Sequence, residues 1–380
     1  MSTRPVTARS ARRHAFRTPL CDRLGIDVPI FSFAHSLEVT AAVSRAGGFG
    51  VYGATHDEPA QILEHARALK EMCEGRPFGL DILLPTVNVE KDDHAAAQAE
   101  IPDQHKQFVE HLRNKYQVPP ATTGHLFINH VRSQELFAAQ ADAVIASGAD
   151  MFAMAVGTPA DIVARSRAAG QVTLSLIGSP RHAVRTRATG VDLIVAQGYD
   201  AGAHTGTVGT LSLVPQVVDL VGDVPVIAAG GIATGRQIAA ALAMGAQGVW
   251  TGTVWLGTRE HAVDPIIARQ LINAESEDTV ISRSWSGKTL RMVRGAWSDE
   301  WEAPGAPRAL KMPYQQVLVG EIVAAVKEHR VEPLMWTPAG QSVAYVRQIT
   351  SVEEVMQRLI DETDEALGRL AALGRSGGAA

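Results

Sequence analysis

The chain has 380 residues, 46% of them hydrophobic, with 35 basic and 40 acidic side chains and a formal net charge of −5. These values suit a large buried core, and they exclude a disordered chain and a generally nucleic-acid-binding surface. No run of about 18 apolar residues suggests a transmembrane helix, and two cysteines, Cys21 and Cys73, are too few for a disulfide framework, so a reducing cytoplasm fits best.

The N-terminal segment is basic. Residues 1–17 carry five arginines and no acidic side chain. A transit peptide has this composition but is also amphipathic, and a secretory signal needs an apolar segment that is lacking here. Because chain termini are frequently disordered, we expect a flexible basic tail.

Short apolar runs and amphipathic Ala-rich stretches then alternate along the chain. The apolar runs are Val28–Phe33, Gly48–Tyr52, Phe78–Leu84, Met151–Val156, Val172–Ile177, Leu193–Gln197, Val224–Ala229 and Gly248–Thr253. Runs that are apolar nearly throughout are typical of strands buried on both faces of a parallel sheet. Eight strand–helix units predict an α/β protein with a (β/α)8 TIM barrel over residues 18–275. A doubly wound open sheet is the alternative, but the glycine motif it would place after the first strand is missing.

Two segments interrupt this alternation. Residues 85–130 form a long insertion after the third strand, and such loops are often lids; we expect a helix near Gln104–Lys115 within it. The insertion contains five histidines without the spacing of metal ligands on a helix, namely His94, His105, His111, His125 and His130. Residues 276–380 follow the eighth strand and should pack on the barrel, with helices near Gln315–Glu328 and Val352–Leu373.

A polar, glycine-rich segment follows the sixth strand. Leu193–Gln197 leads directly into Gly198-Tyr199-Asp200-Ala201-Gly202-Ala203-His204. In a barrel, the carboxyl ends of the strands form the active-site face. A histidine there can move a proton or, when charged, hold an anion, whereas an exposed histidine on a glycine-rich turn is the plain structural alternative.

A second glycine-rich segment ends the seventh strand. Gly230 and Gly231 precede a helix, and the eighth strand ends in Trp250-Thr251-Gly252-Thr253. Backbone N–H groups at a helix N-terminus bind anions, and the loops after strands seven and eight of a barrel frequently bind phosphate. The spacing therefore predicts a phosphate-bearing ligand. Tight packing of glycines at strand–helix turns is the alternative.

The chain resembles the nitronate monooxygenase family, also called the 2-nitropropane dioxygenases. The segments that carry the resemblance are Ala196–Gly206 (AQGYDAGAHTG), Pro225–Thr253, Leu24–Phe31, Ser44–Gly53 and Ala339–Leu359. The glycine and histidine motifs are shared with FMN-dependent enoyl reductases and some quinone reductases. The resemblance therefore indicates fold and cofactor more sharply than substrate.

The resemblance implies a barrel that binds FMN non-covalently and oxidises alkyl nitronates with O₂ to carbonyl compounds and nitrite. The positions that match the family's FMN-binding residues are Asp81, Gln197, Gly202, Gly230, Gly231, Trp250, Thr251, Gly252 and Thr253. His204 matches the family's active-site histidine, which would accept a proton or hold the nitronate. His35, Tyr199 and Asp200 would lie near the substrate.

Several positions depart from the family's usual residues, and they leave the substrate open. Asp81 replaces the usual Asn, Asp200 the usual Glu and Ala203 the usual Gly, while His35 follows a first strand that lacks the usual Ala-Pro-Met. The alternatives are an NAD(P)H-dependent FMN reductase of quinones or enoyl thioesters and a phosphate-binding barrel without redox chemistry. The expected partners are a small-molecule substrate and O₂, with no nucleic acid, membrane or metal. Apolar C-terminal helices are compatible with a homodimer.

Overall fold

The computed structural model describes residues 14, 16–85, 93–122 and 131–376. Eight parallel strands form a closed barrel in the order β1-β2-β3-β4-β5-β6-β8-β9. They are β1 (Ile30–Ala34), β2 (Phe49–Gly53), β3 (Phe78–Leu83), β4 (Met151–Ala155), β5 (Val172–Ile177), β6 (Leu193–Gln197), β8 (Val226–Ala229) and β9 (Gly248–Thr251). Pairing of β1 with β9, with Phe31 opposite Trp250, closes the ring. The predicted TIM barrel is confirmed, and the open sheet is excluded.

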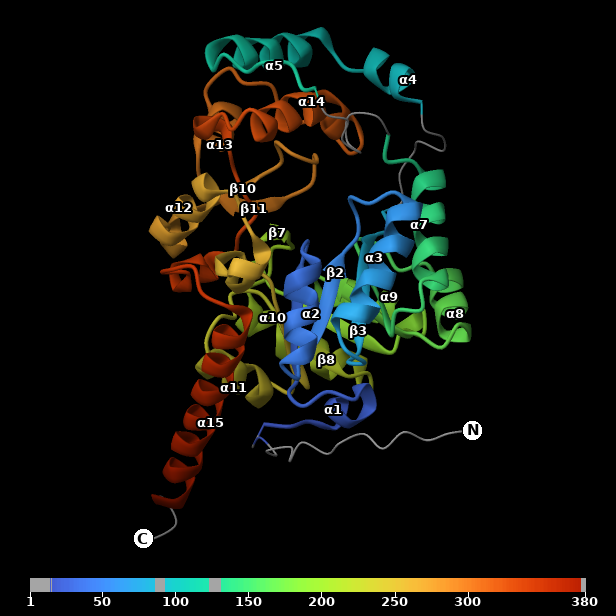
Figure 1. Cartoon of the computed structure of the whole chain (residues 1–380), viewed down its shortest axis with the longest axis vertical. Coiled ribbons are helices and arrows are strands. Elements are labelled where there is room, and N and C mark those ends of the chain that lie inside the picture. Colours follow the sequence, from blue (N-terminus) through green and yellow to red (C-terminus); the bar gives the residue numbers. More distant parts are fainter. Residues whose placement is uncertain (1–13, 15, 86–92, 123–130, 377–380) are drawn as a thin grey trace.

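Helices surround the barrel (Figure 1). They are α2 (Leu37–Arg45), α3 (Pro59–Met72), α7 (Gln134–Ala146), α8 (Ala160–Ala168), α9 (Pro180–Ala188), α10 (Thr210–Val221) and α11 (Gly235–Ala243). Three of them begin after a serine, Ser36, Ser133 or Ser179, whose side chain accepts a hydrogen bond from the backbone N–H three residues on. Such caps satisfy donors that the helix itself leaves free.

The amino-terminal end of the barrel is closed by α1 (Pro19–Leu24). Leu20, Cys21 and Leu24 are buried in one cluster with the barrel-interior rings, which include Phe31 and Phe49. Phe16 is also buried, and the Arg17 guanidinium donates to the Ile26 carbonyl over 2.7 Å. Residues 16 and 17 therefore belong to the folded part rather than to the predicted tail, while residues 1–13 and 15 lie outside the described part of the chain.

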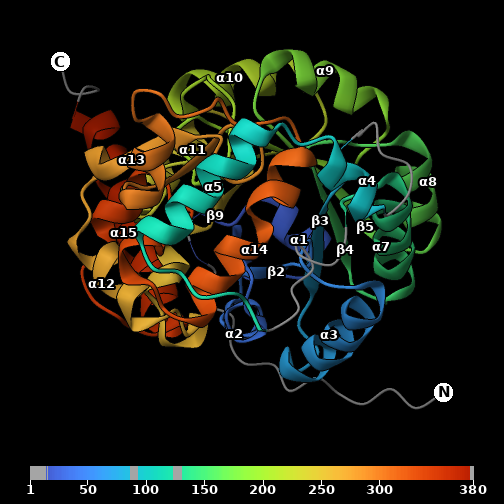
Figure 2. The same cartoon turned by 90° about the horizontal axis from the view of Figure 1, so that it is seen from above.

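The part of the chain after β9 covers the opposite, carboxyl-end mouth of the barrel, whereas its last helix (Val352–Ser376) packs against α11 and α2 at the side of the barrel. Its helices are α12 (Pro265–Asn273), α13 (Ala296–Glu302), α14 (Tyr314–Glu328) and α15 (Val352–Ser376), with short helices η1 (Thr253–Gly257), η2 (Arg259–His261), η3 (Ser276–Asp278), η4 (Glu332–Leu334) and η5 (Gln341–Tyr345). Figure 2, viewed from above, shows α14 crossing the mouth. No helix among the described residues is long and apolar enough to span a membrane.

A small antiparallel sheet that the sequence analysis did not predict joins the barrel to this cover. Its strands are β7 (Ala203–His204), β10 (Thr279–Ser282) and β11 (Leu290–Val293), in the order β10-β11-β7. His204 lies opposite Leu290 in this sheet. The segment after the sixth barrel strand is thereby fixed to residues about 85 positions further along the chain, a pairing that no local pattern shows.

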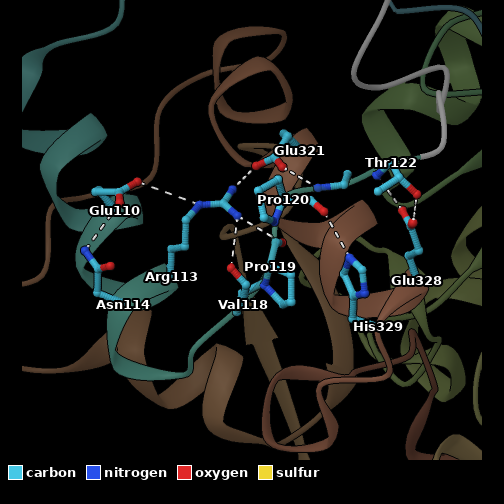
Figure 3. Close-up of polar contacts among 11 residues, drawn as sticks. Glu110, Arg113, Asn114, Val118, Pro119, Pro120, Thr122, Glu321, Glu328 and His329 are labelled. Atoms are coloured by element: carbon cyan, nitrogen blue, oxygen red, sulfur yellow. Dashed lines mark hydrogen bonds and ion pairs between the residues drawn. The ribbon is translucent and has the colours of Figure 1, made fainter.

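The described part of the insertion, 93–122, packs on α14. It contains α4 (His94–Ala99) and α5 (Asp103–Lys115), of which only the second was predicted. Figure 3 shows the polar contacts: the Arg113 guanidinium pairs with the Glu321 carboxylate, and the His329 ring lies 2.9 Å from the Pro120 carbonyl oxygen. His105 bonds a backbone carbonyl of the C-terminal segment, and His125 and His130 lie outside the described residues. The insertion thus adds a second layer over the cover of the mouth.

Candidate active site

A cavity of about 1240 Å³ lies at the carboxyl ends of the barrel strands. Single-ligand pockets are typically about 300–1,000 Å³, so this cavity has room for a cofactor and a substrate together. The structure brings eleven of the predicted site residues into its lining, namely His35, Asp81, Gln197, Gly202, His204, Gly230, Gly231, Trp250, Thr251, Gly252 and Thr253. Their assigned roles stay predictions.

Tyr199 and Asp200 do not belong to the lining of this cavity. The Tyr199 carbonyl accepts two hydrogen bonds from the Arg291 guanidinium, over 3.1 and 3.0 Å, and the Tyr199 ring lies 4.5 Å from the same group. The Asp200 carboxylate accepts from the Thr210 backbone N–H over 2.8 Å, at the start of α10. Both residues hold the glycine-rich segment in place behind the cavity wall.

Glycines give one side of the cavity a bare backbone surface. Gly230 has a φ of +106°, which L-residues rarely adopt, and a Cβ there would lie 2.6 Å from the Thr210 hydroxyl. A Cβ at Gly252 would meet only the Phe33 carbonyl oxygen, at 3.9 Å, and would otherwise stand in the cavity. This open backbone fits the phosphate of a cofactor, which approaches N–H groups closely.

The C-terminal segment completes the glycine-lined side. The Gly340 N–H donates to the Thr253 hydroxyl over 2.8 Å. A Cβ at Gly202 would lie 2.6 Å from the Gly340 nitrogen, so the two loops pack backbone against backbone. Gly340 was not among the predicted site residues, because its contact with Gly202 spans more than 130 positions.

Asp81 is a buried carboxyl group on β3 beside this cavity. Its Oδ2 atom has no hydrogen-bond partner among the described residues. Burial raises the pKa of Asp81 to about 8, because an apolar surrounding disfavours the charged form. At neutral pH the group is therefore protonated and offers an O–H donor, which a polar edge of a bound ring system can accept.

His204 is held at both its backbone and its side chain. Its carbonyl accepts from the Gln197 amide over 3.0 Å, and its Nε2 lies 2.7 Å from the Ser286 hydroxyl oxygen. The preceding Ala203 has a φ of 59°, a left-handed conformation that explains why the family usually has glycine there. Burial, and secondarily the charges of Lys288 and Arg132, lower the pKa of His204 to about 4, so the imidazole is neutral at pH 7.

Two lysines give the cavity a positive character. Lys288 and Lys327 both line it, and burial lowers the pKa of each. Neither ammonium group makes an ion pair with a described residue. Of the carboxyl groups in the lining, Asp81 is neutral and Asp264 is paired with Arg330 over 2.9 Å. An enclosed cation without a counter-charge is costly, and a small anionic ligand would compensate it.

Replacing Lys327 with methionine should weaken the binding of a small anion. A charge-assisted hydrogen bond contributes about 1.5–3 kcal/mol, so we expect nitrate to bind roughly tenfold or more weakly to Lys327→Met. Isothermal titration calorimetry of the protein with nitrate measures this. Lys311→Met, at an exposed position, is the matched control; equal affinities of both variants would contradict the assignment.

The polar cavity residues that were not predicted from the sequence include His56, His261, Lys288 and Lys327. A signal for the first two existed, because each follows a barrel strand on the active-site face, after β2 and after β9 respectively. Lys327 ends an otherwise apolar stretch of α14, and a helix pattern alone does not tell a cavity-facing lysine from a solvated one.

The closed parallel barrel has a cavity at the carboxyl ends of its strands that is lined by both apolar and polar side chains, and this arrangement defines a TIM-barrel enzyme. Residues 23–362 match the nitronate monooxygenase family. The chain belongs to this family of flavin-dependent oxidoreductases, as the sequence motifs predicted.

Individual relatives agree with this membership. A Mycobacterium tuberculosis protein described as a monooxygenase is 40% identical over 375 residues, 94% of this chain and 99% of that protein. A Staphylococcus aureus protein described as a nitronate monooxygenase is 29% identical over 298 residues, which is 74% of this chain and 79% of that protein. Among solved structures, nitroalkane oxidase from Streptomyces ansochromogenes is similar, with 26% identity and a TM-score of 0.78. The match covers 92% of this chain and 99% of that chain. FabK from Thermotoga maritima has 25% identity and a TM-score of 0.72, and the match covers 94% of this chain and 99% of that chain.

Proposed function

We propose that this enzyme binds FMN in the cavity and oxidises alkyl nitronates with O₂ to carbonyl compounds and nitrite. The observation that carries the proposal is the composition of the cavity. A bare glycine backbone faces the same space as a neutral histidine and two lysines that form no ion pair with a described residue. A phosphate-bearing cofactor and a small anionic substrate are the ligands that such a surface favours.

Most of the predicted residues in the cavity lining then have a task that their surroundings allow. Gly230, Gly231 and the Trp250–Thr253 turn would hold the phosphate of FMN, and Gln197 and protonated Asp81 would bond its polar ring edge. Bound FMN supplies the electron acceptance that side chains lack. His204 would position the nitronate and handle the proton at the reacting group, and Lys288 and Lys327 would favour the anionic form of the substrate.

An anaerobic visible spectrum tests the function. The purified protein should show flavin absorbance that propyl nitronate bleaches and that O₂ restores, with release of nitrite. Bleaching by NADPH and not by propyl nitronate would instead assign the alternative reductase of quinones or enoyl thioesters. Protein that stays colourless after FMN is added would remove the cofactor and with it both functions.

Location and assembly are also proposals. We propose that the enzyme works in the cytoplasm, which agrees with the buried free thiols Cys21 and Cys73. We further propose a homodimer, supported by the exposed apolar side chains Leu370 and Leu373 on α15, which are 52% and 71% accessible. Sedimentation velocity distinguishes a dimer of about twice the 40.5 kDa chain mass from a monomer.

A further inference from the structure

One wall of the cavity continues onto the surface of α9. His182, Arg185, Thr186 and Thr189 all line the cavity, and their spacing places them on one side of the helix. Figure 2 shows α9 at the rim of the barrel, to one side of the helix α14 that crosses the mouth. The cavity therefore extends from the mouth along these four residues, which we call the α9 face.

Contacts between loops join the α9 face to the interior of the cavity. The Thr289 hydroxyl, next to Lys288, donates to the Thr205 carbonyl over 3.3 Å. A Cβ at Gly206 would lie only 2.2 Å from the Gly178 carbonyl oxygen, so these two loops meet backbone to backbone. Gly178 directly precedes the residue that caps α9. Since all these residues line the cavity, Lys288 and the α9 face belong to one continuous wall.

The chain around the α9 face is basic. Residues 162–191 contain five arginines and no acidic side chain. Asp192, the acidic residue that follows, already accepts a hydrogen bond from the Arg23 guanidinium over 2.8 Å. The side chains of His182 and Arg185 make no hydrogen bond or ion pair within the described part of the chain. The Arg185 charge is therefore available to an anionic ligand.

This wall lies apart from the turns proposed to hold the phosphate of FMN. Those turns follow β8 and β9, whereas α9 follows β5, and β6 lies between β5 and β8 in the barrel. A small alkyl nitronate has one anionic group, which the lysines inside the cavity can attract. The proposed function thus leaves the α9 face without a ligand.

We propose that the α9 face binds a diphosphate group, so that the enzyme accepts an extended ligand whose other end lies in the cavity. His182 and Arg185 are three positions apart, which places their Cβ atoms about 5–6 Å from each other on the helix surface. Both side chains can therefore contact one diphosphate. Arginine binds phosphate oxygens through two parallel hydrogen bonds, and an imidazole N–H donates a further one. Lys288 adds positive charge on the same wall.

Two kinds of ligand carry this group. One is a substrate linked to a carrier such as coenzyme A, and the other is a dinucleotide such as NADPH. Both have a diphosphate next to an adenosine, so the α9 face would recognise their shared chemistry. The inference goes beyond the proposed function, because it adds a second class of ligand to the cavity.

Calorimetric titration with inorganic pyrophosphate tests the site. The protein is loaded with FMN, which keeps pyrophosphate out of the cofactor's own phosphate site, and the ionic strength is low because salt screens exposed charges. Arg185→Met should weaken the binding of pyrophosphate roughly tenfold, since charge-assisted hydrogen bonds are lost. Arg187→Met is the matched control: it removes the same charge from an exposed position of the same helix that does not line the cavity.

Weaker binding in Arg185→Met but not in Arg187→Met would support the site. Equal affinities of the two variants, or no binding of pyrophosphate to the wild type, would overturn it.

The same titrations with coenzyme A and NADPH identify the source of the diphosphate. The ligand that fits should bind more tightly than pyrophosphate and depend on Arg185 in the same way. It should also change the visible absorbance of the bound flavin, because its other end reaches the cavity. Binding of both compounds without any spectral change would contradict the extended ligand.

The site and the proposed function fail separately. Oxidation of propyl nitronate by a protein that does not bind pyrophosphate would keep the function and remove the site. Pyrophosphate binding that depends on Arg185, in a protein that does not oxidise propyl nitronate, would keep the site and remove the function.

Discussion

Replacing His204 with asparagine should lower the turnover of propyl nitronate by about 10²–10⁴-fold while FMN stays bound. The backbone of residue 204 would still accept from Gln197 and pair with Leu290, so the cavity wall keeps its shape. Only the imidazole and its contact with the Ser286 hydroxyl are lost. Steady-state kcat at saturating O₂, together with the ratio of flavin to protein absorbance, measures both parts of this prediction.

Two further variants make the result specific to the imidazole. Ser286→Ala removes only the hydroxyl beside Nε2 and should cost much less than His204→Asn. His204→Gln returns an amide group to the place of Nε2 and tests whether a hydrogen bond suffices. Unchanged turnover in His204→Asn with full flavin content would refute the assignment of His204 as a catalytic residue.

The pH dependence follows from the lowered pKa of His204. Since burial keeps this pKa at about 4, the ring becomes charged only in acid. Activity that needs the neutral ring should therefore stay level from pH 8 to pH 6 and fall as the pH drops through about 4. A decline centred near pH 6.5, the ordinary range of histidine, would contradict the burial argument.

Replacing Asp81 with asparagine should stabilise the protein increasingly as the pH rises. The folded pKa of about 8 lies above the ordinary value of 3.8, so between these pH values the folded state binds a proton that the unfolded state has lost. The free energy of unfolding of the wild type then falls by up to about 1.4 kcal/mol per pH unit. The loss starts near pH 4 and levels off above pH 8.

Urea unfolding at pH 5, 6.5 and 8 measures this difference. The stability advantage of Asp81→Asn over wild type should grow across the three pH values. Asp219→Asn, at an exposed position of α10, should show no such growth. An advantage that is the same at all three values would mean that Asp81 ionises normally in the folded protein.

The architecture explains how the enclosed cavity arises. The barrel alone leaves its mouth open, and α14 crosses that mouth with α4 and α5 packed on its outer side. Pairs that join the insertion to the C-terminal segment, such as Lys115 with Glu300 at 2.5 Å and Tyr314 with Glu100 at 2.6 Å, hold this double cover together. Enclosure is what shifts the pKa values of His204 and Asp81, because it removes bulk water from around them.

The sequence by itself determined the barrel and one side of the cavity. Apolar runs of strand length, alternating with amphipathic stretches, reproduced the eight barrel strands to within about two residues. The glycine motifs at Gly230 and Gly252 follow directly from strand ends. The strands and glycine motifs show in the local periodicity and in residues adjacent in the chain. They can therefore be predicted without knowing which distant segments come into contact.

Only the tertiary structure decided which polar groups lie close together and which of them are protonated at neutral pH. Lys327 on α14 and His35 after β1 come from opposite ends of the chain, and their meeting in one cavity depends on how the cover folds back over the barrel. The contact between His204 and Ser286 likewise depends on how the chain folds, and so does the burial that keeps Asp81 protonated. Hydration and electrostatic interactions depend on distances in space, which a pattern along the chain does not specify.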